Sequence, residues 1–206
     1  MATQILSTVA NWIMGVISSL NYGGVIILMA INSANVPIPS EVIMPFSGFL
    51  VAQGTMNLWL VGIAGAVGCV IGSVFSYYLG YLGGRPLIEK YGKYILISHH
   101  DLNIADKWFG KYGEITVFFG RFVPVVTTFI SFPAGIARMK LSKFIIYSFL
   151  GSLVWATFLA FIGKKLGDNW ERLRGYFHSF DWIILVFIAA GIVWWVWRHS
   201  KNRKLS

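Results

Sequence analysis

Residues 120–135 read GRFVPVVTTFISFPAG, and this stretch decides the fold. It is apolar enough to lie at membrane depth, yet it carries Arg121 and the prolines Pro124 and Pro133. A charge at the centre of a bilayer costs about 2.5–3.5 kcal/mol on insertion scales, so such a residue usually has a function and a partner. Proline breaks helices, and broken backbone at membrane depth persists only where it is buried in protein or lines a polar cavity. The stretch therefore predicts a re-entrant hairpin that forms one wall of a substrate site.

The whole chain has the composition of an integral membrane protein. Of its 206 residues, 56% are hydrophobic and 12% are charged, whereas soluble domains contain about 25% charged residues. The formal net charge of +9 fits the basic cytoplasmic loops of membrane proteins. We expect no nucleic-acid binding, because no recognisable basic face accompanies this charge. The single cysteine, Cys69, excludes an intrachain disulfide and a cysteine metal site.

A second broken apolar segment lies nearer the N-terminus. Its two arms flank Pro37 and Pro39, and each arm is shorter than the roughly 20 residues that a spanning helix needs. We predict a first re-entrant hairpin over 22–53, in which Ser40 caps the second arm and Glu41 lies in its first turn. Glu41 is the only charged residue among the first 84.

The remaining segments predict an all-α polytopic protein with a single membrane domain over 1–206. Its two hairpins pack with three to four transmembrane helices, and a first helix over 8–20 either lies in the membrane interface or starts the bundle. The predicted segments are transmembrane helices over 56–83, 142–163 and 182–197, a cytoplasmic amphipathic segment over 85–113, the second hairpin over 114–138 and a basic tail over 198–206.

Loop charges predict the orientation of the chain. Lys and Arg are more numerous in 85–111, in 138–143 and in the tail than in 163–174. We therefore place the first three segments, and with them the C-terminus, in the cytoplasm. The two hairpins then enter from opposite faces as the halves of an inverted repeat, with the substrate near the midplane between them.

Three charged residues are the candidates for substrate chemistry. Arginine binds phosphate well because its planar fork donates parallel hydrogen bonds, so Arg121 and Arg138 are predicted phosphate contacts. Glu41 either couples transport to protons, as a carboxyl group in an apolar site, or is the counter-charge of Arg121. A purely structural Glu41–Arg121 ion pair between the hairpins is the plain alternative.

Signs of enzymatic chemistry are weak. His99, His100 and Asp101 are adjacent, but no second cluster of ligands accompanies them, so we predict a helix cap and solvated histidines in place of a metal site. The chain also has no hydrolytic motif and no phosphate-binding glycine loop. We expect no cofactor, no metal and no enzyme activity.

In several of these motifs the chain resembles the DedA family, also called the SNARE-associated or VTT-domain family. The resemblance rests on PIPSEVIMPFSG at 37–48, GRFVP at 120–124 and FPAG at 132–135, and it extends over roughly 20–165. It implies two opposed re-entrant hairpins and a lipid-translocating role. Bacterial members are linked to the return of undecaprenyl phosphate across the cytoplasmic membrane, others to phosphatidylethanolamine, and dependence on the proton-motive force is a family theme.

The chain departs from the family pattern at two positions. Family members usually have an acidic residue where this chain has Asn32, and a second arginine where it has Thr127. The two differences remove one charge of each sign. We therefore hypothesise that Asn32 and Thr127 lie close together across the hairpin tips.

The charged residues and the resemblance together predict a flippase that recycles undecaprenyl phosphate across the bacterial cytoplasmic membrane. A flippase or scramblase for phosphatidylethanolamine, with Glu41 near the ammonium group, is the second hypothesis. An intramembrane lipid phosphatase and a structural membrane protein are alternatives from other classes. The expected partner is a membrane lipid, and proton coupling and homo-oligomerisation stay open.

Overall fold

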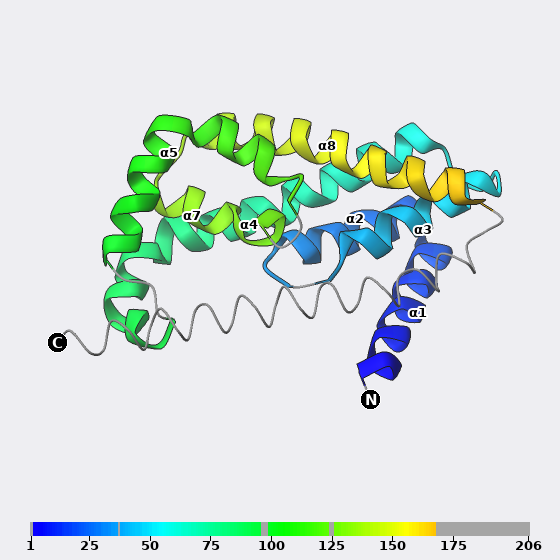
Figure 1. Cartoon of the computed structure of the whole chain (residues 1–206), viewed down its shortest axis with the longest axis horizontal. Coiled ribbons are helices and arrows are strands. Elements are labelled where there is room, and N and C mark those ends of the chain that lie inside the picture. The colour runs from blue at the N-terminus through cyan, green and yellow to red at the C-terminus, as the bar shows by residue number, and fades with distance from the viewer. Residues whose placement is uncertain (1, 37, 96–98, 124–125, 168–206) are drawn as a thin grey trace. The chain divides into compact units, whose positions relative to one another are not determined.

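The computed structural model describes residues 2–36, 38–95, 99–123 and 126–167 (Figure 1). The chain divides into two compact units, Met1–Lys165 and Leu166–Ser206, and nearly all described residues belong to the first. These residues form helices and loops with no strand, which confirms the predicted all-α class for this part of the chain. Pro37, Pro124, the predicted span over 182–197 and the basic tail lie outside the described residues.

The described helices follow one another with short connections. They are α1 (Ala2–Leu20), α2 (Tyr22–Ser33), α3 (Ser40–Ala52), α4 (Leu58–Ile95), α5 (His99–Gly120), α6 (Val126–Phe129), α7 (Ser131–Ile136) and α8 (Leu141–Leu166).

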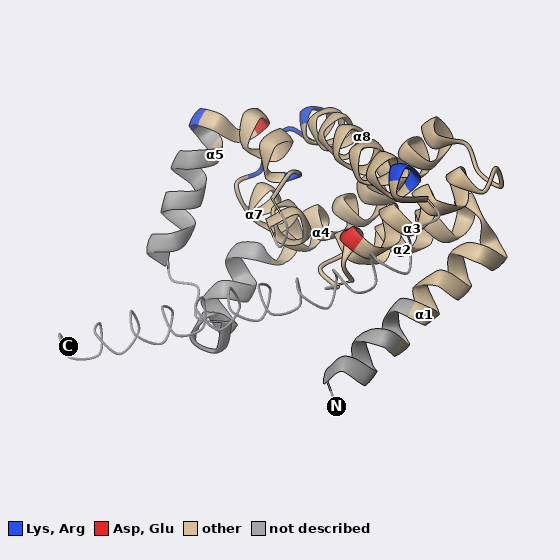
Figure 2. Cartoon of the chain, turned by 45° about the vertical axis from the view of Figure 1, so that its right-hand side comes forward, with Lys and Arg blue, Asp and Glu red and all other residues tan. Residues whose placement is uncertain are grey.

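Two of these helices are long and apolar enough to cross a membrane. They are α8 over its whole length and the Leu58–Gly83 part of α4, close to the predicted spans over 56–83 and 142–163. Large apolar side chains on their outer faces are exposed, for example Trp59 at 69% and Phe158 at 52%. In Figure 2 the ribbon of the two spans is tan over most of its length, and charged residues lie near the helix ends. Apolar side chains that face outward over such a length suit contact with lipid.

The first predicted hairpin corresponds to α2 and α3, which contact each other and also α1 and α4. Asn35, directly after the C-cap residue of α2, has a φ of 69°, a left-handed conformation that asparagine tolerates better than most residues. The hydroxyl of Ser76 on α4 donates a hydrogen bond to Asn35 Oδ1 at 3.0 Å and holds this turn. Ser40 was expected to cap α3, and this prediction is wrong. Pro39 occupies the cap position, and the buried Ser40 hydroxyl has no partner among the described residues.

The second predicted hairpin begins within α5, which continues unbroken from the predicted amphipathic segment to Gly120. A turn after Gly120 reverses the chain, and α6 and α7 form the returning arm. Pro133 was predicted to break this arm, but it lies in the first turn of α7, where a missing backbone N–H is tolerated. The arm ends at Arg138, which has a φ of 50°, and the N–H of Met139 bonds to the carbonyl of Ala134. The side chains of 84–108 lie outside the described residues.

Glycines let the arms of the hairpins approach the two spans closely. A Cβ atom on Gly72 of α4 would lie 1.9 Å from the carbonyl oxygen of Ala30 on α2, and one on Gly135 of α7 would lie 2.0 Å from that of Tyr77 on α4. On the other span, a Cβ atom on Gly163 would lie 2.0 Å from the carbonyl oxygen of Pro45 on α3. Such small-residue contacts are the usual means of close helix packing in membranes. Each span is therefore in backbone contact with a hairpin arm from the other half of the chain.

We predict that Gly135→Ala lowers the stability of the protein by about 1–3 kcal/mol, because a methyl group at this position must push α7 away from α4. Gly15→Ala is the control, since a Cβ atom there meets nothing within 4 Å. Thermal unfolding of the purified protein in detergent measures both variants. An unchanged unfolding temperature for Gly135→Ala would show that the α4–α7 contact is looser than the structure has it.

Candidate functional site

Arg121 is the most deeply buried charged residue of the described chain, with an exposed fraction of 0%. It lies in the turn directly after α5. Its Nη2 donates to the hydroxyls of Ser73 at 2.8 Å, Ser148 at 2.9 Å and Ser131 at 3.4 Å. Its Nη1 donates to the carbonyl oxygen of Thr127 at 3.2 Å. All four acceptors are neutral.

The acceptors of Arg121 come from every element around the turn. Ser73 lies on α4, Ser131 on α7 and Ser148 on α8, while Thr127 belongs to α6. Removing a charge from water is costly unless its hydrogen bonds are satisfied. The guanidinium therefore ties the second hairpin to both spans at one point.

Polar groups without a partner lie along the α8 face that meets this turn. Ser148 binds Arg121, a Cβ atom on Gly151 would lie 3.1 Å from Arg121 Cγ, and the ring of Trp155 packs edge-on against that of Phe122 with centroids 6.0 Å apart. Among the described residues, three buried polar atoms of this region have no hydrogen-bond partner: Arg121 Nε, Ser152 Oγ and Trp155 Nε1. Each can donate a hydrogen bond, so the region has spare donors for an anion.

Glu41 does not pair with Arg121 among the described residues. It lies in the first turn of α3 with intermediate exposure, and the hydrogen bonds of Arg121 go to hydroxyls and one carbonyl. The structure thus contains neither the predicted counter-charge contact nor the plain ion pair between the hairpins.

The two departures from the family pattern lie on helices that contact each other. Asn32 is buried near the end of α2 and Thr127 is buried on α6, and α2 contacts α6. The amide nitrogen of Asn32 donates to the carbonyl oxygen of Ile38 across the first hairpin turn. That the side chains of Asn32 and Thr127 lie side by side stays a hypothesis.

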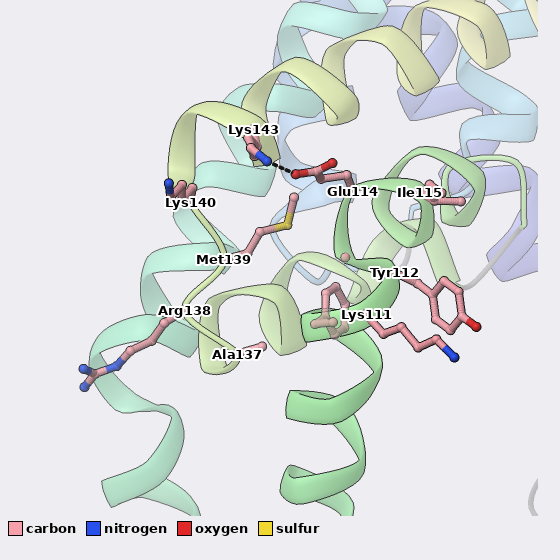
Figure 3. Close-up of a pocket in the computed structure, with 11 residues that line it drawn as sticks. Lys111, Tyr112, Glu114, Ile115, Ala137, Arg138, Met139, Lys140 and Lys143 are labelled. Carbon is pink, nitrogen blue, oxygen red and sulfur yellow. Dashed lines mark hydrogen bonds and ion pairs between the residues drawn. The ribbon is translucent and has the colours of Figure 1, made fainter.

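Arg138 belongs to a different place from Arg121. Its guanidinium lies over the ring of Tyr81 on α4, 5.4 Å from the centroid, and the residue lines a pocket of about 390 Å³ that does not include Arg121. Figure 3 shows this pocket between α5 and the turn that joins α7 to α8. The two predicted phosphate contacts are therefore one buried residue and one exposed residue at separate sites.

Sequence reasoning missed the serines around Arg121 and the basic pocket. The serines had a visible signal, since Ser73 and Ser76 lie one turn apart in an otherwise apolar span, and so do Ser148 and Ser152. The pocket had no such signal in the sequence, because its lining comes from two separate segments, 109–115 and 137–143. Only the folded chain brings these two segments together.

Comparison with known proteins decides the family. The family model described as the VTT domain matches residues 38–165, and this match ends at the last residue of the first compact unit. The chain belongs to the DedA family. Since the match includes α3, the two spans and the elements around Arg121, the site described above is part of the DedA domain itself.

Relatives agree with this assignment. The DedA chain is 36% identical to undecaprenyl phosphate transporter A of Bacillus subtilis, over 91% of this chain and 92% of the relative. It is 30% identical to the protein of the same name from Staphylococcus aureus, over 91% and 95% of the two chains. An alkaline phosphatase-like protein of Lactococcus lactis is 37% identical over 86% of this chain and 85% of the relative. No solved structure matches the chain. Together with the two apolar spans, these relatives make it a membrane protein of bacterial type.

We predict that Ser148→Ala destabilises the DedA domain by about 1.5–3 kcal/mol, because the buried guanidinium loses an acceptor. Ser152→Ala is a matched control on the same helix, since its buried hydroxyl has no partner among the described residues. Thermal unfolding in detergent compares the two variants. Equal unfolding temperatures would mean that the hydroxyl of Ser148 does not hold Arg121.

Proposed function

We propose that the protein translocates a polyprenyl phosphate of the undecaprenyl phosphate class across the bacterial cytoplasmic membrane. Two relatives with about a third of their residues identical to this chain carry the name undecaprenyl phosphate transporter. In both cases the similarity extends over nine-tenths of this chain, so it includes the spans and both hairpins. The names of these relatives support the ligand class, and the surroundings of Arg121 support the mechanism.

The observation that carries the mechanism is the fully buried Arg121 with neutral acceptors only. A phosphate monoester can replace serine hydroxyls as the acceptor for the guanidinium and gain charge-assisted hydrogen bonds. The spare donors of Ser152 and Trp155 can bind further oxygens of the same group. Arg121 is thus the proposed phosphate contact at depth.

We further propose that both hairpins are re-entrant. Helices α2 and α3 have 12 and 13 residues, which gives lengths of roughly 18–20 Å. The hydrocarbon core is about 30 Å thick, so neither arm spans it alone. The hairpin tips, and with them Arg121 in the turn after α5, would then lie at membrane depth.

Glu41 is proposed to couple transport to protons, because it is half-buried in the first turn of α3 and has no partner among the described residues. In the proposed mechanism Glu41 acts separately from the phosphate contact at Arg121.

We predict that Arg121→Gln lowers translocation of undecaprenyl phosphate in proteoliposomes by about 10- to 100-fold, the loss expected for a hydrogen-bonded charge. Arg121→Lys keeps the charge without the planar fork and is expected to fall between wild type and Arg121→Gln. Glu41→Gln should retain passive translocation and lose its stimulation by a pH gradient. Accessibility of the labelled lipid headgroup to an external reagent measures all three.

The controls for this assay separate the alternatives. Lys164→Gln changes an exposed charge at the far end of α8 and should transport normally. Equal rates for wild type and Arg121→Gln would refute the role of the arginine. Movement of labelled phosphatidylethanolamine alone would favour the aminophospholipid flippase, and release of inorganic phosphate from the lipid would favour a phosphatase.

The re-entrant arrangement predicts that both ends of the first hairpin face the same side of the membrane. After Cys69→Ala, single cysteines at Asn21 and Gln53 test this, since both positions are exposed and flank α2 and α3. A membrane-impermeant maleimide should label both from outside intact cells. Labelling from opposite sides would mean that the chain crosses the membrane between these two residues.

A further inference from the structure

A second polar site lies in the pocket between α5 and the turn from α7 to α8 (Figure 3). Its volume of about 390 Å³ is within the range of small-ligand sites. Four cationic residues, Lys111, Arg138, Lys140 and Lys143, line it together with one carboxylate, Glu114. The pocket therefore has an excess of positive charge among its lining residues.

The pocket lies at the level where the spans end. Helix α8 begins at Leu141, and the apolar part of α4 ends at Gly83. Two tyrosines near that end of α4 contact the turn: Tyr77 donates a hydrogen bond to the carbonyl oxygen of Met139, and Tyr81 lies under Arg138. Tyrosine and basic residues at span ends mark the headgroup region of a bilayer. A ligand in this pocket would thus be a headgroup or a small anion at the interface.

The cationic residues of the pocket are arranged in two different ways. The amine of Lys111 lies 5.0 Å from the ring centroid of Tyr112, and Arg138 lies over Tyr81. In Figure 3 both of these side chains extend away from the pocket, whereas Glu114 and Lys143 point toward each other from α5 and α8. The ion pair of Glu114 and Lys143 therefore crosses the pocket.

Both side chains of this ion pair are exposed enough for a ligand to replace one of them. The side chain of Lys143 is 52% exposed and that of Glu114 is 37% exposed, and ion pairs in contact with solvent contribute little to stability. A phosphate monoester carries about 1.5 to 2 negative charges at pH 7, more than one carboxylate. It can therefore compete with Glu114 for the amine of Lys143.

We propose that this pocket is a docking site for a phosphate monoester at the membrane interface, separate from Arg121. Lys143 binds the phosphate oxygens, and Glu114 is an internal competitor that the phosphate displaces. The ligand class rests on the proposed function, whereas the competition between Glu114 and the phosphate rests on the geometry of the pocket.

The test is binding of farnesyl phosphate, a short polyprenyl monophosphate, to the purified full chain in neutral detergent. Glu114→Gln should bind about 2- to 5-fold more tightly than wild type, because the competing carboxylate is gone. Lys143→Gln should bind about 2- to 5-fold more weakly. Lys164→Gln, a matched charge removal on α8 outside the pocket, should bind like wild type. Isothermal titration calorimetry gives the dissociation constants.

Glu114→Gln and Lys143→Gln are expected to change the affinity in opposite directions, which a purely structural role of the ion pair would not produce. If the pair only stabilises the fold, both variants lower the unfolding temperature alike and neither tightens binding, which overturns the proposal. Weaker or unchanged binding by Glu114→Gln also overturns it. If Lys143→Gln does not fold, the tighter binding expected of Glu114→Gln still decides the proposal.

Two further probes identify the source of the phosphate. If the two variants change the affinity for inorganic phosphate in the same way, the site recognises the phosphate group alone. If only the affinity for farnesyl phosphate changes, the site recognises a lipid headgroup. Equal shifts with phosphatidylglycerol, a phosphodiester, would refute the choice of a monoester. Wild type that fails to translocate undecaprenyl phosphate but shows the opposite shifts would refute the proposed function and leave this site intact.

Discussion

The buried guanidinium of Arg121 is the constraint on which the rest of the structure depends. A charge with no solvent contact needs acceptors on several sides, and the hydroxyls that supply them lie on α4, α7 and α8. Those helices must therefore come close to one turn of chain. Gly151 allows this on α8, because a Cβ atom there would lie 2.8 Å from the carbonyl oxygen of Phe118. The hydrogen bonds of Arg121 and the close packing at Gly151 therefore both bring α8 close to the end of α5.

The same contacts give the domain a paired organisation. Span α4 is in close contact with α2, an arm of its own half, and with α7 from the other half. Span α8 is in close contact with α5 from its own half and with α3 from the other. Each span therefore holds one arm of each hairpin. The two spans are thus related in the same way to the two hairpins, and whether the halves form an inverted repeat stays a prediction.

The sequence predicted those parts of the fold that follow from local composition. Apolar length identified the two spans of the described chain, and the interruptions of the apolar pattern located the turns after α2 and α5. What the sequence could not supply were contacts between distant faces. Arg121 could have paired with Glu41 on charge alone, yet its side-chain acceptors are serines, because the faces of α4 and α8 that meet it carry hydroxyls. The basic pocket was missed for the same reason, since Glu114 and Lys143 meet only through folding.

For the proposed translocation of a phosphate, neutral acceptors around Arg121 are better suited than a carboxylate partner would be. An ion pair buried in apolar surroundings is costly to separate, because each charge left behind is uncompensated. Serine hydroxyls can release the guanidinium to a phosphate without leaving a charge unpaired, and each hydroxyl can then donate to the same phosphate. In the exposed pocket, where water screens the charges, the ion pair of Glu114 and Lys143 contributes little to stability. The difference in burial therefore explains why the exposed lysine has a carboxylate partner and the buried arginine has none among the described residues.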